Sequence, residues 1–440
     1  MPDKIPIWLA VLGAVAVVGA GGGIYFIRPI NPAHEYGIAI PSPPIPNAFD
    51  RYRAAFKGFR LEPVAQVLDY EADQEKKEDP RKYPLSGKQA WLERQRVGLS
   101  LFEEGLKLPS AYPAIRSIPE ETEAPSHEEL RELAKCIEVR NQVWSQTGQH
   151  EEAAQGALDI WQMGLQIANG APLIPATNGQ AIEIYARRSL NGEIAYLTGP
   201  QAAKAARRLE KLLNSRVTYR EVLLEERNTM PFLIPRIHDK GIYDRKQEAK
   251  NAEAAARGES TFFYDTSPPP RNTGLTDNLA VRLITRKYLG SMDKAITESE
   301  TPWPSRTIPV GSSGEIIPIN EKLVNMVAKG RFLFERSDAL SRIFLARLAL
   351  HAYRKDKNRY PASLQELVPP YLSKVPEDPF SNKQPLLYRL DGKRYKLWSV
   401  GPDSRDDAAT PAQRVNPRSP SAKYVFGPDS TGDVVANISR

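Results

Sequence analysis

The chain has 440 residues, 41% of them hydrophobic and 26% charged, which is long enough for two or three domains and a sizeable core. Its formal net charge of +7 is spread along the chain, without the block of basic and aromatic residues typical of nucleic-acid binding. We therefore expect no nucleic-acid partner. The single cysteine, Cys136, excludes an internal disulfide and any zinc site built from several cysteines.

The N-terminus begins with an apolar stretch that we interpret as a retained membrane anchor. Residues 5–27 carry no charged side chain, and a spanning helix needs about 20 apolar residues. Trp8 and Tyr25 stand near the two ends of this stretch, where interfacial aromatic residues are typical. A cleavable signal peptide, with its small-residue site at 18–20, is the alternative. We expect residues 1–28 to form a transmembrane helix.

The next segment, residues 29–47, is rich in proline and predicts a semi-rigid stalk. Its prolines are Pro29, Pro32, Pro41, Pro43, Pro44 and Pro46. This composition favours extended polyproline II, which advances about 3.1 Å per residue. A proline-rich ligand for a partner domain is the alternative interpretation.

Residues 48–330 predict an α-helical body, because apolar residues recur at intervals of three and four. Residues 128–170 predict a helical hairpin that turns at Gly148, and this hairpin resembles one tetratricopeptide unit. A further helix should begin near Pro200 and stop before Pro231. As a whole, the body resembles uncharacterised bacterial membrane-anchored proteins, a resemblance that implies no activity.

Two long loops interrupt the predicted body at residues 260–274 and 299–320, where Pro, Gly and Ser are frequent. Their aromatic side chains either cover a groove or pin the loops to the helices. These side chains are Phe262, Phe263, Tyr264 and Trp303.

The body offers few residues that suggest catalysis. The sequence contains no HExxH, no GxSxG and no phosphate-binding loop. Glu183 and Glu225 lie in amphipathic stretches, where they form either an acid/base pair or salt bridges and solvated faces. The first reading predicts an envelope hydrolase whose site lies under the 260–320 loops.

The last part of the chain, residues 331–440, predicts an α+β domain. Residues 331–357 read as one long helix, and residues 363–368 as a short helical turn. Two strands should follow, PLLYRL and RYKLWSV, joined at Asp391-Gly392 as a β-hairpin. The fold class expected for the whole chain is thus mainly α with a small antiparallel sheet near the C-terminus.

This domain resembles the globular head of the type II secretion major pseudopilins, the G-type of the general secretion pathway. The matching motifs, in the family's order and spacing, are RYP at 359–361, SLQEL at 363–367, YLSKVPEDPF at 371–380 and LWSVGPD at 397–403. The resemblance implies an α+β head in which the loop after the LWS strand binds calcium. It departs from the family at the N-terminus, which lacks the pseudopilin processing motif.

The predicted calcium ligands are five aspartates in two copies of the motif GPDSxxD, which begin at Gly401 and Gly427. The family's loop, carried onto this sequence, places Asp403, Asp406 and Asp407 from the first copy and Asp429 and Asp433 from the second. Calcium takes six to eight oxygen ligands, and acidic loops supply them. The alternative is a pair of turns in which these aspartates cap backbone amides.

These features predict a single-pass protein of the bacterial inner membrane with an extracytoplasmic body. The expected role is binding or assembly at the cell envelope, with a partner in the envelope or in secretion or pilus-like machinery. Calcium would be structural. The envelope hydrolase is the competing class.

Overall fold

The computed structural model describes residues 30–59, 80–113, 127–256, 275–303, 318–412 and 426–436. The predicted anchor at 1–28 and the loop at 260–274 lie outside this part. Within the described residues, no helix combines the length and the apolar character that crossing a membrane requires.

The chain divides into two compact units. The first comprises residues 1–41, 114–120 and 226–294, and the second comprises residues 42–113, 121–225 and 295–440. The predicted boundary at 330/331 falls inside helix α13, Pro318–Lys357, which is continuous across it.

The first unit contains helix α3, Pro32–Glu35, and most of helices α11, Tyr219–Ala256, and α12, Leu275–Ser299. Asn31 caps α3 through its side chain, so one helical turn stands inside the segment predicted as an extended stalk. A buried ion pair joins Arg282 Nε of α12 to Glu35 Oε1 at 2.8 Å.

Helix α11 corrects one prediction from the sequence. The single helix expected from Pro200 is two helices, because helix α10, Gly199–Asn214, ends before α11 begins at Tyr219. Helix α11 includes Pro231 and Pro235, so the expected stop before Pro231 is wrong. Each proline removes one backbone N–H from the helix. The neighbouring Met230, Phe232 and Ile234 are buried, and their packing offsets these lost hydrogen bonds.

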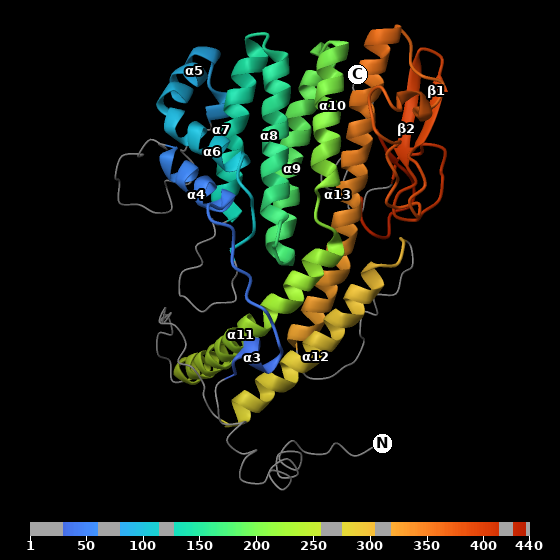
Figure 1. Ribbon diagram of the computed structural model, residues 1–440. Coiled ribbons are helices and arrows are strands. Elements are labelled where there is room, and N and C mark those ends of the chain that lie inside the picture. The colour runs from blue at the N-terminus through green and yellow to red at the C-terminus, as the bar shows by residue number, and fades with distance from the viewer. Residues whose placement is uncertain are drawn as a thin grey trace. The chain divides into compact units, whose positions relative to one another are not determined.

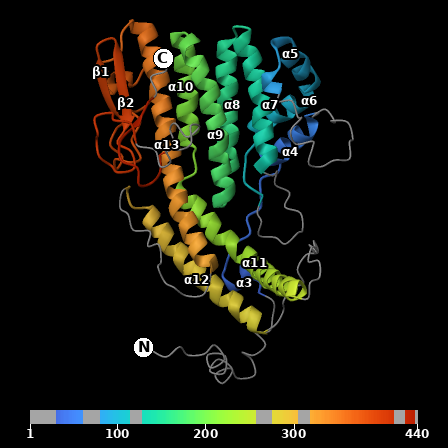
Figure 2. The same cartoon turned by 180° about the vertical axis from the view of Figure 1, so that it is seen from behind.

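The second unit is a set of helices that run side by side (Figures 1 and 2), with α8 packed against α7 and α9, which also contact each other, and with α10 against α13. Besides α13, the helices of its described part are α4 Ala48–Gly58, α5 Leu85–Arg94, α6 Arg96–Leu106, α7 His127–Gln146, α8 His150–Ala168, α9 Leu173–Glu193 and α10 Gly199–Asn214. Short 3-10 turns are η2 Pro80–Lys82, η3 Ile194–Tyr196 and η4 Leu364–Leu367.

Several predicted elements of this unit are confirmed. Helices α7 and α8 form the expected hairpin, and Gly148 between them adopts a positive φ of 80°. Helix α10 begins at Gly199 with Pro200 in its first turn. Helices α8 and α9 approach closely, because a Cβ on Gly179 would lie only 2.4 Å from the carbonyl oxygen of Gly164.

The sheet has three antiparallel strands in the order β1-β2-β3. Strand β1, Leu387–Asp391, pairs with β2, Arg394–Ser399, in the predicted hairpin, and Gly392 supplies the positive φ of its turn. Strand β3, Val434–Val435, pairs with the end of β2. The described residues are therefore mainly helical with a small antiparallel sheet, as expected.

The hydrophobic core of the second unit includes residues from both predicted parts of the chain. Trp161 of α8 meets Phe344 of α13 with ring centroids 5.8 Å apart. Because one core spans these elements, side chains from α8, α9 and α13 are brought together at the centre of the unit.

Candidate functional site

The two GPDSxxD copies lie together in the structure. Asp433, from the second copy, accepts hydrogen bonds from the backbone N–H of Asp407 at 3.3 Å and of Ala409 at 2.7 Å. In return, Asp403 of the first copy accepts one from Gly432 N at 3.1 Å. Burial raises the pKa of Asp433 to about 6, and the nearby aspartates add to this shift.

The other three predicted ligands, Asp406, Asp407 and Asp429, make fewer contacts between the two copies. Asp406 Oδ1 accepts from the Trp398 indole N–H and from Ala408 N, both at 3.0 Å. Asp407 supplies its backbone N–H to the second copy, as described above, and Asp429 is exposed.

These contacts follow the alternative in which the aspartates cap backbone amides. Among the residues that the structure describes, no group of three or more His, Cys, Asp or Glu side chains could hold a metal ion. Calcium also draws on main-chain carbonyls and water, and the carboxylates retain further lone pairs. The calcium site stays a prediction.

Trp303, in the described start of the second predicted loop, is packed in the core and does not cover a groove. Its buried indole N–H donates to the carbonyl oxygen of Pro402 at 2.9 Å, and its ring meets Phe380 at 5.3 Å. The aromatic residues Phe262, Phe263 and Tyr264 lie outside the described residues.

Glu183 forms salt bridges, which was the second of its two predicted roles. Its carboxylate bonds Arg216 and lies 3.5 Å from Arg187, and it also accepts from the Trp161 indole at 3.0 Å. Glu225, its proposed acid/base partner, lies in α11.

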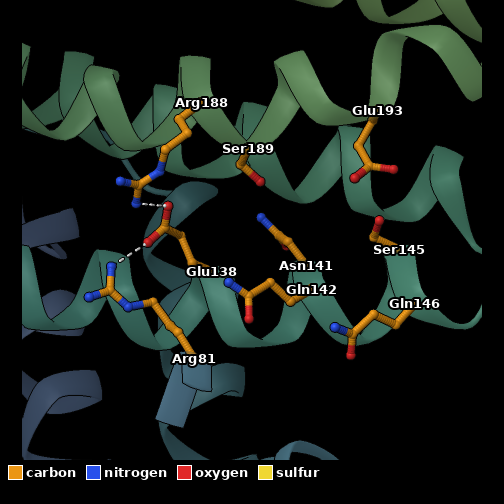
Figure 3. Close-up of a pocket in the computed structure, with 9 residues that line it drawn as sticks. All are labelled: Arg81, Glu138, Asn141, Gln142, Ser145, Gln146, Arg188, Ser189 and Glu193. Atoms are coloured by element: carbon orange, nitrogen blue, oxygen red, sulfur yellow. Dashed lines mark hydrogen bonds and ion pairs between the residues drawn. The ribbon is translucent and has the colours of Figure 1, made fainter. Parts of the chain in front are cut away.

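A polar groove lies between α7 and α9, with η2 at one end (Figure 3). Its volume is about 500 Å³. Side-chain amides, hydroxyls and ionic groups line it, namely Arg81, Glu138, Asn141, Gln142, Ser145, Gln146, Arg188, Ser189 and Glu193. We call it the α7–α9 groove.

One end of the groove holds a carboxylate shared by two arginines. Glu138, whose side chain is 5% exposed, binds Arg81 at 3.0 Å and Arg188 at 2.7 Å, one through each oxygen. The Arg188 side chain is 61% exposed and also lies over the Tyr185 ring. This end presents guanidinium groups to solvent, which suits a carboxylate or carbonyl of a ligand.

The other end of the groove is acidic. Glu193 lies 2.7 Å from His150 Nδ1, and the imidazole stacks on Tyr196 with centroids 4.2 Å apart. The stacking and the carboxylate together hold the imidazole in one orientation.

The middle of the groove contains polar atoms without partners. Asn141 is 2% exposed, yet within the described part of the chain neither its Nδ2 nor its Oδ1 has a hydrogen-bond partner. The same holds for Gln142 Oε1. A Cβ on Gly156 of α8 would lie 2.1 Å from Asn141 Oδ1, so glycine makes room for this amide. Figure 3 shows the amide between α7 and α9, near Ser189.

Comparisons of the chain with protein-family models, with curated proteins and with solved structures found no match.

The groove residues were not predicted from the sequence. The sequence does contain a pattern for them. One face of α7 carries polar residues at the helical spacing i, i+3, i+4 and i+7, namely Glu138, Asn141, Gln142 and Ser145. Such a polar stripe on a largely buried helix is the pattern that could have revealed them.

Proposed function

We propose that the protein is a membrane-anchored envelope protein with a binding or assembly role, and that the α7–α9 groove is its ligand site. Asn141 Nδ2, which lies near Ser189 (Figure 3) and has no hydrogen-bond partner among the described residues, carries this proposal. A buried polar group without a partner costs about 1–3 kcal/mol, and a ligand that supplies the partner recovers this free energy. A protein can retain an unpaired polar group of this kind where the group serves to bind a ligand.

The chemistry of the groove favours binding over hydrolysis. Both groove carboxylates are held by basic side chains, Glu138 by two arginines and Glu193 by His150. A catalytic acid or base must exchange its proton with the substrate, and a carboxylate held in ion pairs does not fit that role. The competing hydrolase was placed under loops of which 260–274 and 304–317 lie outside the described residues.

The ligand class that fits the groove is a short peptide segment. Asn141 Nδ2 offers a donor and Gln142 Oε1 an acceptor, which together match the two polar groups of a peptide main chain. From Glu138 to Gln146 helix α7 advances about 12 Å, which spans three to four extended residues at about 3.3 Å each. The guanidinium end suits an acidic terminus, and Glu193 suits an amino group.

The test is fluorescence anisotropy of dye-labelled peptide mixtures, three to five residues long, against the full chain. We expect binding by the wild type and by the control Gln149→Ala, whose exposed amide lies outside the groove. Gln146→Ala removes a groove amide and should weaken binding by about 5-fold, because one hydrogen bond contributes about 1 kcal/mol. Absence of peptide binding, or equal weakening by both variants, contradicts the proposed ligand class.

The link to type II secretion and the structural calcium ion rest on the resemblance of residues 331–440. Calcium binding should raise the melting temperature of the wild type relative to the same protein in chelator. The double variant Asp403→Ala with Asp429→Ala should lose this shift, whereas Asp391→Ala, in the β1–β2 hairpin, should keep it. No shift in the wild type, or an unchanged shift in the double variant, eliminates the site.

A further inference from the structure

Two arginines and one glutamate meet on the side of α9 that faces α13, and a third arginine stands next to Ser337 of α13, whose hydroxyl lies 3.5 Å from Arg187. Arg187 is four residues after Glu183 on α9, Arg216 follows α10, and Arg336 is on α13. The charges of Arg216 and Arg336 both act on Arg187. We call this group the buried arginine cluster.

The cluster carries more positive than negative charge. Glu183 lies 3.5 Å from Arg187 and bonds Arg216, and it is the carboxylate that these two arginines contact in the described part of the chain. Arg336 makes no hydrogen bond or ion pair with any described residue, and its guanidinium lies 5.2 Å from the centroid of the Phe426 ring. Two positive charges therefore lack a described counter-charge.

Several N–H donors of this cluster have no acceptor. Arg216 Nε and Arg336 Nε are buried and unpartnered within the described residues, and so is Gln180 Nε2, one helical turn before Glu183. Arg187 donates to two hydroxyls, with Ser341 Oγ at 3.2 Å and Ser337 Oγ at 3.5 Å, and lies no closer than 3.5 Å to the Glu183 carboxylate.

Burial makes this excess of charge unfavourable. Loss of hydration lowers the pKa of Arg187 to about 10, and repulsion from the other two arginines acts in the same direction. Burial likewise lowers the pKa of Arg336. A buried ion pair is tolerated when its charges and donors are matched, and here they are not matched.

From the unmatched charge and the unpartnered donors, we propose that the buried arginine cluster binds a small oxyanion such as phosphate, sulfate or a carboxylate. A guanidinium presents its N–H groups as a planar fork that fits the oxygens of these anions. Arg336 would supply the charge that Glu183 leaves unmatched. This inference is independent of the α7–α9 groove, which is lined by other residues of α9.

The test uses thermal melting and calorimetric titration of the full chain with inorganic phosphate and sulfate, against chloride at equal ionic strength. We expect a saturable rise in melting temperature with one anion bound per chain. Arg336→Gln should weaken that binding by about 10-fold or more, as expected for loss of a charged hydrogen-bond donor.

The control is Arg347→Gln, because Arg347 is also a partly buried arginine of α13 whose guanidinium lies 5.2 Å from a phenylalanine ring, that of Phe344. It should leave anion binding unchanged. Arg336 has no described polar partner, so its loss should not unfold the protein, and in chloride the melting temperature should be equal or higher. A wild type without a saturable response, or equal binding by Arg336→Gln, overturns the proposal.

Discussion

Helix α9 contributes to two sites of charged side chains, and the ion pairs of these sites differ in their exposure to water. In the α7–α9 groove, Glu138 binds two arginines, one of which is 61% exposed. Toward α13, the Glu183 side chain is 3% exposed, and that of its partner Arg216 is 10% exposed. Water can replace a lost partner in the first site but not in the second. Loss of one partner of an ion pair should therefore lower the stability of the protein more in the buried site than in the groove.

The largest expected effect is on the buried side of α9. Glu183→Gln leaves Arg187 and Arg216 buried without a counter-charge and should lower the free energy of unfolding by about 3–5 kcal/mol. Glu138→Gln should lower it by only about 1–2 kcal/mol, because its arginine partners can turn to solvent. Urea denaturation of the two variants measures the difference. Equal losses would refute the comparison.

A second test concerns how closely α9 packs. Gly179→Ala places a Cβ 2.4 Å from Gly164 O and should destabilise the protein by about 2–3 kcal/mol, because the backbones must separate. Gly192→Ala, near the end of the same helix, meets nothing within 4 Å and should stabilise it by about 0.5–1 kcal/mol. The denaturation midpoints of the two variants measure these changes, and we expect the midpoints to shift in opposite directions from that of the wild type. Two variants of the same sign would contradict the close approach of α8 and α9.

The third test concerns Glu335 of α13, a carboxyl that burial leaves poorly solvated. Burial and then the charge of Asp338 raise its pKa to about 7, while Arg331 and Arg342 lower it and Asp378 raises it further. The folded state therefore holds its proton more tightly than the unfolded state, and this contribution to stability is lost as pH rises from about 4.5 to about 7.

Glu335→Gln should remove that loss. We expect the variant to be more stable than the wild type at pH 8, by about 1–2 kcal/mol, and nearly equal to it at pH 4. Urea denaturation across this range provides the measurement. A difference that does not vary with pH would show that Glu335 ionises as freely in the folded state as in the unfolded state.

The smallest expected effect is in the groove. Asn141→Leu replaces a buried amide that has no partner among the described residues with an apolar side chain of similar size. It should change stability by at most about 1 kcal/mol, in the stabilising direction. Asn47→Leu is the matched control, since Asn47 caps α4 and donates to Ala111 O at 2.8 Å. It should destabilise by about 1–2 kcal/mol in thermal or urea unfolding. A comparable loss in Asn141→Leu would mean that its amide is paired.

Elements specified by neighbouring residues could be predicted. The α7–α8 hairpin turns at Gly148, α10 begins around Pro200, and the β1–β2 hairpin turns beside Asp391, each because a few adjacent residues decide the backbone conformation. The stop expected before Pro231 failed, because buried apolar neighbours outweighed the local penalty of proline.

The amino-acid sequence by itself determined the helical periods, the turns and the mainly α composition of this protein, since these depend on interactions within a few residues. Only the tertiary structure decided what each polar residue contacts. Glu183 binds Trp161 and Arg216 from other elements, and Asn141 lacks a partner among the described residues because of how α8 and α9 pack against α7. Such long-range contacts arise from burial in a common core, which the spacing of residues along the chain does not specify.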